Sequence, residues 1–148
     1  MAKDIIPHIN FESSVDAIAY YERVFGAENA NRMPLNKEMA ENFGYSKDDT
    51  DLESHTVHGS MHIFDQPIYF ADIFNNIAQL PTGLTFLLGT TMDDAAAITE
   101  LESLWGKVVS SGEVEVTMPF AEQFWGGKFG QLTDKFGITW QFGVNEQL

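Results

Sequence analysis

Four histidines are the side chains of this sequence best suited to hold a metal ion or to move a proton: His8, His55, His58 and His62. His58 and His62 have the i, i+4 spacing that brings two imidazoles together on a helix. The segment 55–64, however, alternates apolar and polar residues as a half-buried strand does. Four positions along a strand separate two side chains by roughly 13 Å, which is too far for one ion. We therefore interpret the last three histidines as surface or strand-packing residues.

His8 is a different case, because it belongs to the first β-rich segment of the chain. In that strand Ile9 and Phe11 share a face that we expect to pack on a helix, and His8 and Asn10 share the other face. His8 is thus predicted to point into any concavity that the sheet encloses, as a ligand, a hydrogen-bond donor or a general base. The alternative, which stays open, is that His8 has a structural role and hydrogen-bonds to neighbouring backbone groups.

The composition narrows the classes of partner. The chain has 148 residues with 22 Asp or Glu against 8 Lys or Arg, and its formal charge is −14. Such a surface repels nucleic acid and anionic lipid, which leaves small neutral or cationic partners. The chain has no cysteine, which is compatible with a reducing compartment. The start resembles no signal peptide, and no apolar run reaches the roughly 18 residues of a membrane span, so a cytoplasmic protein is expected.

The chain contains two similar halves. Before each helix pattern lies a short apolar strand with a capping candidate, Ser13 or Ser14 in the first half and Thr90 or Thr91 in the second. Two amphipathic helices that end in glycine can also look alike by chance. The helix patterns match at one constant offset: Ile18, Tyr21, Phe25 and Gly26 correspond to Ile98, Leu101, Trp105 and Gly106.

Each half is predicted to form a βαβββ module, with residues 1–80 in the first module, 81–148 in the second, and one domain in all. The predicted strands after the helices are 27–34, 55–64 and 67–73 in the first half, and 107–109, 128–133 and 138–144 in the second. The last two flank Asp134 to Gly137, a hairpin turn. The acidic stretch 36–54 is an insertion, either a lid over a site or a solvated excursion.

The C-terminal segment carries a family resemblance. Trp125-Gly126, a glycine-bearing strand, Asp134-Lys135-Phe136-Gly137 and then Trp140 resemble the closing motif of the PhnB-like branch of the vicinal oxygen chelate superfamily. That superfamily includes glyoxalase I, bleomycin-resistance proteins and extradiol dioxygenases. The opening 6–11, followed by 17–21 and 24–28, is similar to the start of the same branch. The resemblance covers nearly the whole chain except the acidic insertion.

The resemblance implies an α+β fold in which two tandem βαβββ modules form curved mixed sheets around a cavity, the glyoxalase/bleomycin resistance-like fold. A second subunit often completes that cavity, so a homodimer is expected. Metal-using members of the superfamily take one ligand from the opening strand and one from the closing strand of each module. His8 fits the first of these positions and Gln141 the last. The two middle positions hold Tyr69 or Phe70 and Thr85 or Phe86.

This donor set favours a pocket without a metal ion. Zinc, nickel or iron needs about three good protein ligands, and the chain offers one good and one weak ligand. No cofactor is therefore expected and no residue is assigned to a metal, although a divalent metal stays possible if Asp72 or Glu122 supplies a carboxylate. Trp105, Trp140 and Phe142 are expected in the core.

The predicted site combines one catalytic candidate, His8, with ligand-binding candidates at His8, Tyr69, Phe86, Phe124, Trp125 and Gln141, of which Phe124 and Trp125 would form the pocket rim. The main functional hypothesis is a PhnB-like small-molecule-binding protein or a metal-independent enzyme of unidentified substrate. The second hypothesis is sequestration of a cationic antibiotic of the bleomycin type, which the net charge would assist. The third is a metal-dependent lyase, isomerase or dioxygenase acting on vicinal oxygens.

Overall fold

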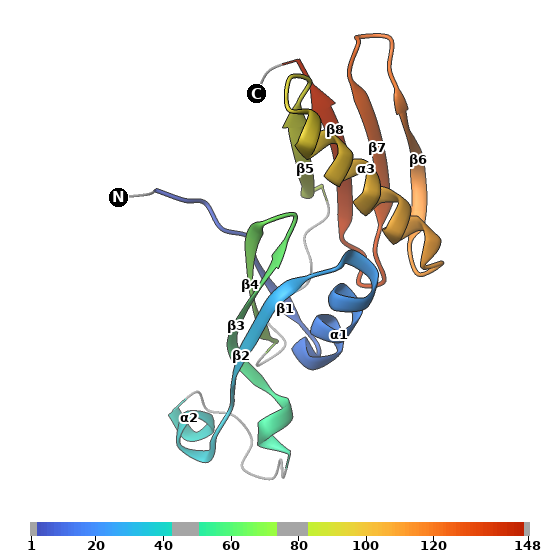
Figure 1. The fold of residues 1–148 in the computed structure, drawn as a ribbon. Coiled ribbons are helices and arrows are strands. Elements are labelled where there is room, and N and C mark those ends of the chain that lie inside the picture. Colours follow the sequence, from blue (N-terminus) through green and yellow to red (C-terminus); the bar gives the residue numbers. More distant parts are fainter. Residues whose placement is uncertain (1–2, 43–50, 74–82, 147–148) are drawn as a thin grey trace. The chain divides into compact units, whose positions relative to one another are not determined.

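The computed structural model describes residues 3–42, 51–73 and 83–146. The chain divides into two compact units, Met1–Leu80 and Pro81–Leu148, and the predicted module boundary lies at the same point. Each unit contains a four-stranded sheet with a long helix, α1 in the first unit and α3 in the second (Figure 1). None of the helices in the described ranges is long and apolar enough to cross a membrane.

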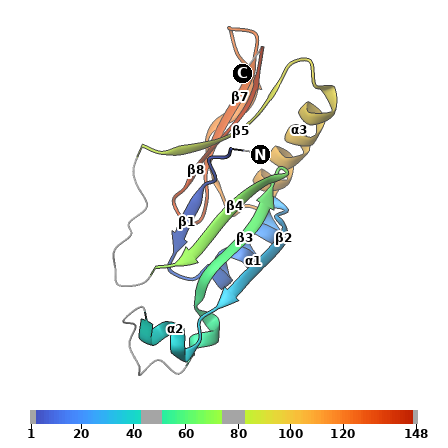
Figure 2. The same cartoon turned by 90° about the vertical axis from the view of Figure 1, so that its left-hand side faces the viewer.

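The first unit has the predicted βαβββ order. Its sheet has the strand order β1-β4-β3-β2, in which β1 runs parallel to β4 and the other pairs are antiparallel. The helix α1 lies along one face of this sheet (Figure 2). The acidic insertion contributes two short helical segments, α2 and η1. The elements are β1 (His8–Phe11), α1 (Ser14–Phe25), β2 (Glu28–Pro34), α2 (Lys37–Asn42), η1 (Leu52–Ser54), β3 (Thr56–Ile63) and β4 (Gln66–Asp72).

The second unit repeats this topology with the strand order β5-β8-β7-β6, in which β5 runs parallel to β8. The α+β class and the two mixed sheets built from tandem βαβββ modules are thereby confirmed. The cavity that the resemblance implies stays a prediction. The elements are β5 (Thr85–Thr91), α3 (Ala95–Ser110), β6 (Glu115–Glu122), β7 (Lys128–Thr133) and β8 (Thr139–Asn145).

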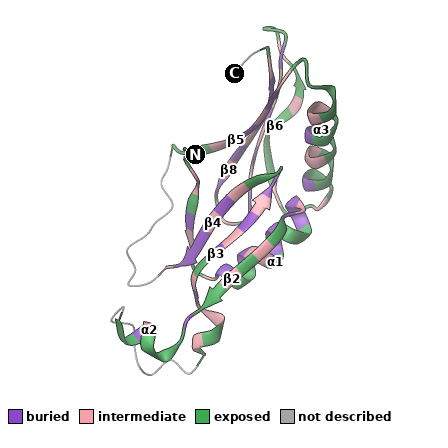
Figure 3. Ribbon diagram, turned by 60° about the vertical axis from the view of Figure 1, so that its left-hand side comes forward, coloured by how far each residue is buried: buried purple, intermediate pink, exposed green. Residues whose placement is uncertain are grey.

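The helix α1 begins and ends where its sequence directs. Ser13 has extended backbone, and its side chain accepts a hydrogen bond from the Asp16 N–H, which satisfies a donor of the first turn. Gly26 ends the helix in the left-handed conformation, φ 67°, which glycine adopts without strain. The buried stripe, which includes Tyr21 and Phe25, faces the sheet. Figure 3 shows the same division of buried and exposed residues along each helix.

The helix α3 departs from the prediction at both ends. Thr90 and Thr91 belong to β5, and the capping side chain is that of Asp94, which accepts from the Ala97 N–H. Gly106 does not end the helix, and the strand predicted at 107–109 is wrong, because the helix continues to Ser110. The extra turn is stabilised by Val108, which is fully buried and extends the apolar stripe. The burial of Val108 therefore outweighs the low helix propensity of Gly106.

The predicted hairpin between β7 and β8 is confirmed, and Asp134 organises it. This carboxylate is 6% exposed. Its Oδ1 accepts from the backbone N–H groups of Phe136 and Ile138 at 2.8 and 3.0 Å, and its Oδ2 accepts from the Trp140 indole N–H at 2.9 Å. Gly137 adopts φ 86° in the turn. The motif on which the family resemblance rests is therefore a structural clamp.

One glycine in each sheet permits a close approach of its neighbours. A Cβ on Gly59 of β3 would lie 2.3 Å from the Phe70 ring, and a Cβ on Gly130 of β7 would lie 2.7 Å from the Phe120 Cα. Both glycines occupy the same place in their sheets, since Gly59 pairs with Phe70 of β4 and Gly130 with Phe142 of β8. Neither position has room for a side chain.

Replacing Gly106 by Ala is expected to stabilise the protein by roughly 0.5–1 kcal/mol, because Gly106 lies inside α3 with nothing within 4 Å of its Cβ position. Gly130→Ala is expected to destabilise it, since the methyl group meets the backbone of Phe120. Urea unfolding of both variants measures the difference. A loss of stability in Gly106→Ala would show that the helix ends there after all.

Replacing Asp134 by Asn is expected to cost roughly 1–3 kcal/mol, because an amide N–H₂ would then face the buried indole N–H of Trp140. Glu115→Gln, which changes an exposed carboxylate of β6, serves as the matched control. The free energy of unfolding is measured in urea for Asp134→Asn, Trp140→Phe and the double variant. This double-mutant cycle isolates the contribution of the hydrogen bond between the two side chains. Additive losses in that cycle would contradict the clamp.

Candidate functional site

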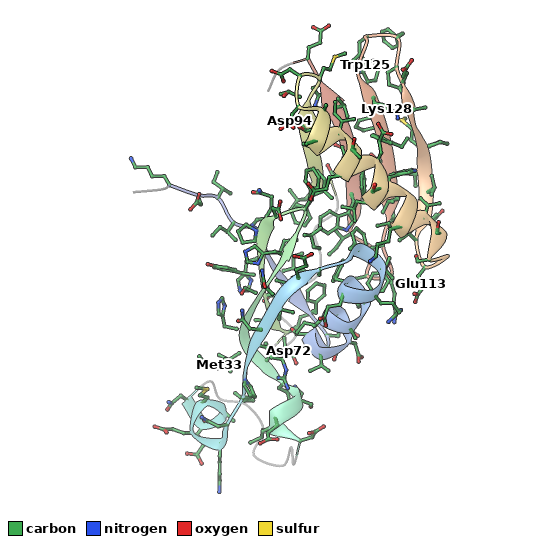
Figure 4. The ribbon with its side chains drawn as sticks, in the orientation of Figure 1. Met33, Asp72, Asp94, Glu113, Trp125 and Lys128 are labelled. Carbon is green, nitrogen blue, oxygen red and sulfur yellow. The ribbon has the colours of Figure 1, made fainter. Side chains whose placement is uncertain are left out.

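The face of the first sheet that α1 does not cover, here called the open face, gathers the polar residues of this unit. Ile9 and Phe11 are buried on the α1 side, as predicted, whereas His8 is exposed. Register and alternation place on the open face His8 and Asn10 of β1, Pro67, Tyr69 and Ala71 of β4, His58, Ser60 and His62 of β3, and Glu28, Asn31 and Met33 of β2. Met33 is labelled in Figure 4.

Three rings from three different strands meet on this face. His8 of β1 pairs with Tyr69 of β4 in the parallel register. The His58 ring of β3 stacks on the His8 ring with centroids 6.3 Å apart, and it meets the Tyr69 ring edge-on at 5.0 Å. Ala71, the next residue of β4 on this face, carries only a methyl group, so it leaves room for the imidazole. We call His8, Tyr69 and His58 the ring cluster.

The structure adds His58 to the predicted pair of His8 and Tyr69. Spacing along a single strand cannot reveal this contact, because His58 reaches His8 across the intervening strand β4. The sequence signal that could have indicated the contact is the alternation of β3, which places His58 on one face, together with the expected pairing of the first and last strands of the module. His8 and His58 are both exposed and Tyr69 is half-buried, so these groups are accessible as hydrogen-bond donors and acceptors.

The other two histidines have different surroundings. The His55 Nδ1 lies 3.4 Å from the Asp72 Oδ2, and the Asp72 Oδ1 accepts from the backbone N–H of Ser14 at 2.8 Å. Asp72 is 3% exposed and supports the start of α1, so it is not free to act as the alternative carboxylate ligand (Figure 4). The Nδ1 of His62 is buried without a hydrogen-bond partner in the described part of the chain.

The second unit corrects one predicted position. Leu87 pairs with Gln141 across the parallel strands β5 and β8, as His8 pairs with Tyr69 in the first unit. Neither Thr85 nor Phe86 therefore occupies the third position of the superfamily pattern. The Phe86 ring packs 5.3 Å from the ring of Trp140, a buried core residue, so Phe86 does not share a face with Gln141.

The partners on the two parallel strand pairs include few metal ligands. His8 pairs with Tyr69 in the first unit and Leu87 with Gln141 in the second, and among these side chains only the imidazole is a strong ligand for zinc, nickel or iron. Within residues 3–42, 51–73 and 83–146, no group of three His, Cys, Asp or Glu could hold an ion. The expected lack of a cofactor and the possible divalent metal both stay predictions.

Gln141 belongs to a chain of hydrogen bonds across the second sheet. Its Nε2 donates to the Gln131 Oε1 at 3.0 Å, and the Gln131 Nε2 donates to the Thr117 Oγ1 at 3.1 Å. Beside it Leu87 is 48% exposed. Amides and a hydroxyl can orient a ligand by hydrogen bonding, but they do not transfer protons near neutral pH.

Phe124 and Trp125 lie between β6 and β7, where the chain turns at the end of the hairpin (Figure 4). Their rings meet edge-on with centroids 5.0 Å apart, and the two residues are 97% and 50% exposed. Both side chains are therefore free to contact a partner molecule. Their role as a pocket rim stays a prediction.

The solved structures with similar topology define the class of fold. The PhnB protein of Bacillus cereus superposes with a TM-score of 0.60 at 17% identity, over 96% of this chain and 99% of that chain. A glyoxalase/bleomycin resistance protein/dioxygenase family enzyme of Burkholderia phytofirmans PsJN superposes with a TM-score of 0.51 at 14% identity, over 93% and 94%. The two units thus form the glyoxalase/bleomycin resistance/dioxygenase fold.

Sequence similarity identifies the family. Protein YjdN of Escherichia coli K12 is 30% identical to this chain over 150 residues, which cover 95% of each protein. The chain belongs to the family of YjdN. No family model matches the sequence.

Replacing Tyr69 by Leu is expected to shift the ring-proton resonances of His58, because the edge-on contact of the two rings is lost. Tyr69→Phe keeps the ring and should leave those resonances nearly in place. The measurement is a carbon–proton correlation spectrum of the histidine rings, with His55 as the internal reference. Equal spectra in both variants would contradict the ring cluster.

Proposed function

We propose that this chain is a PhnB-like small-molecule-binding protein that holds its ligand against the ring cluster of the first sheet. The observation that supports the proposal is the convergence of His8, Tyr69 and His58 from three strands on the face that α1 leaves free. Exposed aromatic and polar groups that converge in this way are typical of ligand sites. The helix-covered face of the same sheet carries the core.

Each group of the cluster has a definite capacity. The imidazoles of His8 and His58 can donate or accept hydrogen bonds, and the Tyr69 hydroxyl can do both. Histidine is also the side chain best matched to proton transfer near neutral pH. The proposal therefore includes a metal-independent enzyme in which His8 is the general base. Gln141 stays the polar ligand-binding candidate of the second unit.

The proposal includes a homodimer in the cytoplasm. In the described strands, β1 and β2 end the first sheet and β5 and β6 end the second. Proteins usually cover such edges, and a second copy of the chain is the simplest cover. Most of β6 is exposed on both of its faces (Figure 3), which makes it the strand with the most surface to offer a partner.

Sequestration of a cationic antibiotic is the second candidate, and the charge of −14 favours it. It shares the ring cluster with the first candidate, because imidazole and phenol rings can also stack against a cation. Titration at two ionic strengths separates the two candidates, since attraction by distant carboxylates weakens as salt is added.

The His8→Ala variant is expected to bind a ligand found by fragment screening about tenfold more weakly, a loss of about 1.4 kcal/mol. Far-UV circular dichroism and urea unfolding should be unchanged, because His8 is exposed and makes no core contact. Val15→Ala, on the exposed side of α1, is the matched control.

The affinity itself is measured by ligand-observed NMR and by calorimetry on the full chain. Unchanged affinity in His8→Ala, or hits that perturb only residues away from the open face, would contradict the proposal.

A further inference from the structure

The open face differs in charge from the rest of the molecule. The chain carries 22 acidic residues, yet β1, β3 and β4 place none of them on this face. These strands instead present three imidazoles, one phenol and small or amide side chains: His8, Asn10, His58, Ser60, His62, Pro67, Tyr69 and Ala71. On these three strands the open face thus offers several hydrogen-bonding side chains and no carboxylate, and the edge strand β2 adds Glu28.

The carboxylates nearest in sequence or register lie outside contact with the ring cluster. Glu28 of β2 pairs with His62, which lies four positions, roughly 13 Å, along β3 from His58. Asp72 is buried against Ser14 and His55.

Other charged groups of this unit are also directed elsewhere. Asp4 and Glu12 lie four residues before and after His8, outside β1, and both are exposed. Arg32 donates to the backbone oxygen of Glu53 and to the Thr56 hydroxyl. In β2 the partner of His58 is Met33, an exposed apolar side chain.

From this distribution we infer that the ligand of the ring cluster is an organic acid, a carboxylate attached to a flat apolar body. The inference rests on the proposed function and names the class of ligand for the same site. A carboxylate accepts hydrogen bonds from the imidazole N–H groups and from the Tyr69 hydroxyl. The apolar body would lie against the rings and Met33.

The stacked imidazoles of His8 and His58, with ring centroids 6.3 Å apart, offer N–H donors from two strands to one carboxylate. A cationic ligand has no acceptor for these donors.

The test uses three probes of one shape and three charges: benzoate, benzamide and benzamidinium. Each is titrated into the full chain at one pH and constant ionic strength, and the histidine ring resonances report binding. Probes of this size bind weakly, so concentrations reach about 20 mM. Benzoate should bind about fivefold or more tighter than benzamide. Benzamidinium should bind least.

Variants assign the effect to the cluster. His8→Ala and His58→Ala should each weaken benzoate binding, and His62→Ala, on the same face of β3, is the matched histidine control. Asn10→Asp introduces a carboxylate beside His8 on β1, so it should weaken benzoate and strengthen benzamidinium. A variant that merely disturbed the fold would weaken both probes.

Two results would overturn the inference and leave the proposed function intact. The first is benzamidinium or benzamide binding as tightly as benzoate. The second is a set of screened ligands that perturb the ring cluster but are neutral or cationic, with no effect of benzoate. If no ligand of any charge perturbs the cluster, the proposed function fails together with the inference.

Discussion

The parallel pairing of the first strand of each unit with its last strand is the constraint on which the rest of the structure depends. Parallel neighbours cannot be joined by a tight hairpin, so the chain must leave through a helix and return through further strands. That helix covers one face of the sheet and requires apolar residues there. The alternate residues of the same two strands are thereby brought side by side on the other face, as His8 and Tyr69 are.

The two units carry different side chains at equivalent positions of this scaffold. On the face that the helix covers, the paired positions are apolar in both units, with Ile9 beside Phe70 in the first unit and Leu88 beside Phe142 in the second. On the other side the pair of His8 and Tyr69 is matched by Leu87 and Gln141. Truncating a packed core residue costs several kcal/mol, whereas a residue on an uncovered face can change at little cost. At these paired positions the two units therefore differ on the face that the helix does not cover and agree on the face that it covers.

The sequence predicted the parts of the fold that local patterns determine. Ser13 and Gly26 delimit α1, the alternation from Val57 to Ile63 indicates β3, and the turn from Asp134 to Gly137 gives the last hairpin. These signals act between residues close in the chain. They therefore needed no knowledge of the tertiary structure.

The cap of α3 was misplaced although Asp94 is a local signal, whereas the other failures involve contacts between distant residues. Gly106 is a plausible helix end until Val108 is seen to be buried. The register of β5 against β8 places Leu87, and not Thr85 or Phe86, beside Gln141, because no turn joins these strands and fixes their register. The contact of His58 with His8 required knowing that β4 lies between their strands. The site is consequently less predictable than the fold, since it is assembled from three strands.

The charge of the whole chain differs from that of the open face, and this difference shows which properties of binding the net charge influences. At physiological salt the Debye length is about 8 Å, so exposed carboxylates farther away act weakly on a group bound at the ring cluster. They influence how fast a charged ligand approaches, whereas the groups in contact determine how well it is held. A charge of −14 spread over the chain therefore predicts the partners that the surface repels, such as nucleic acid. In the proposed site, the groups in contact with the ligand are the imidazoles and phenol of the cluster, so these groups determine the charge that such a site would accept.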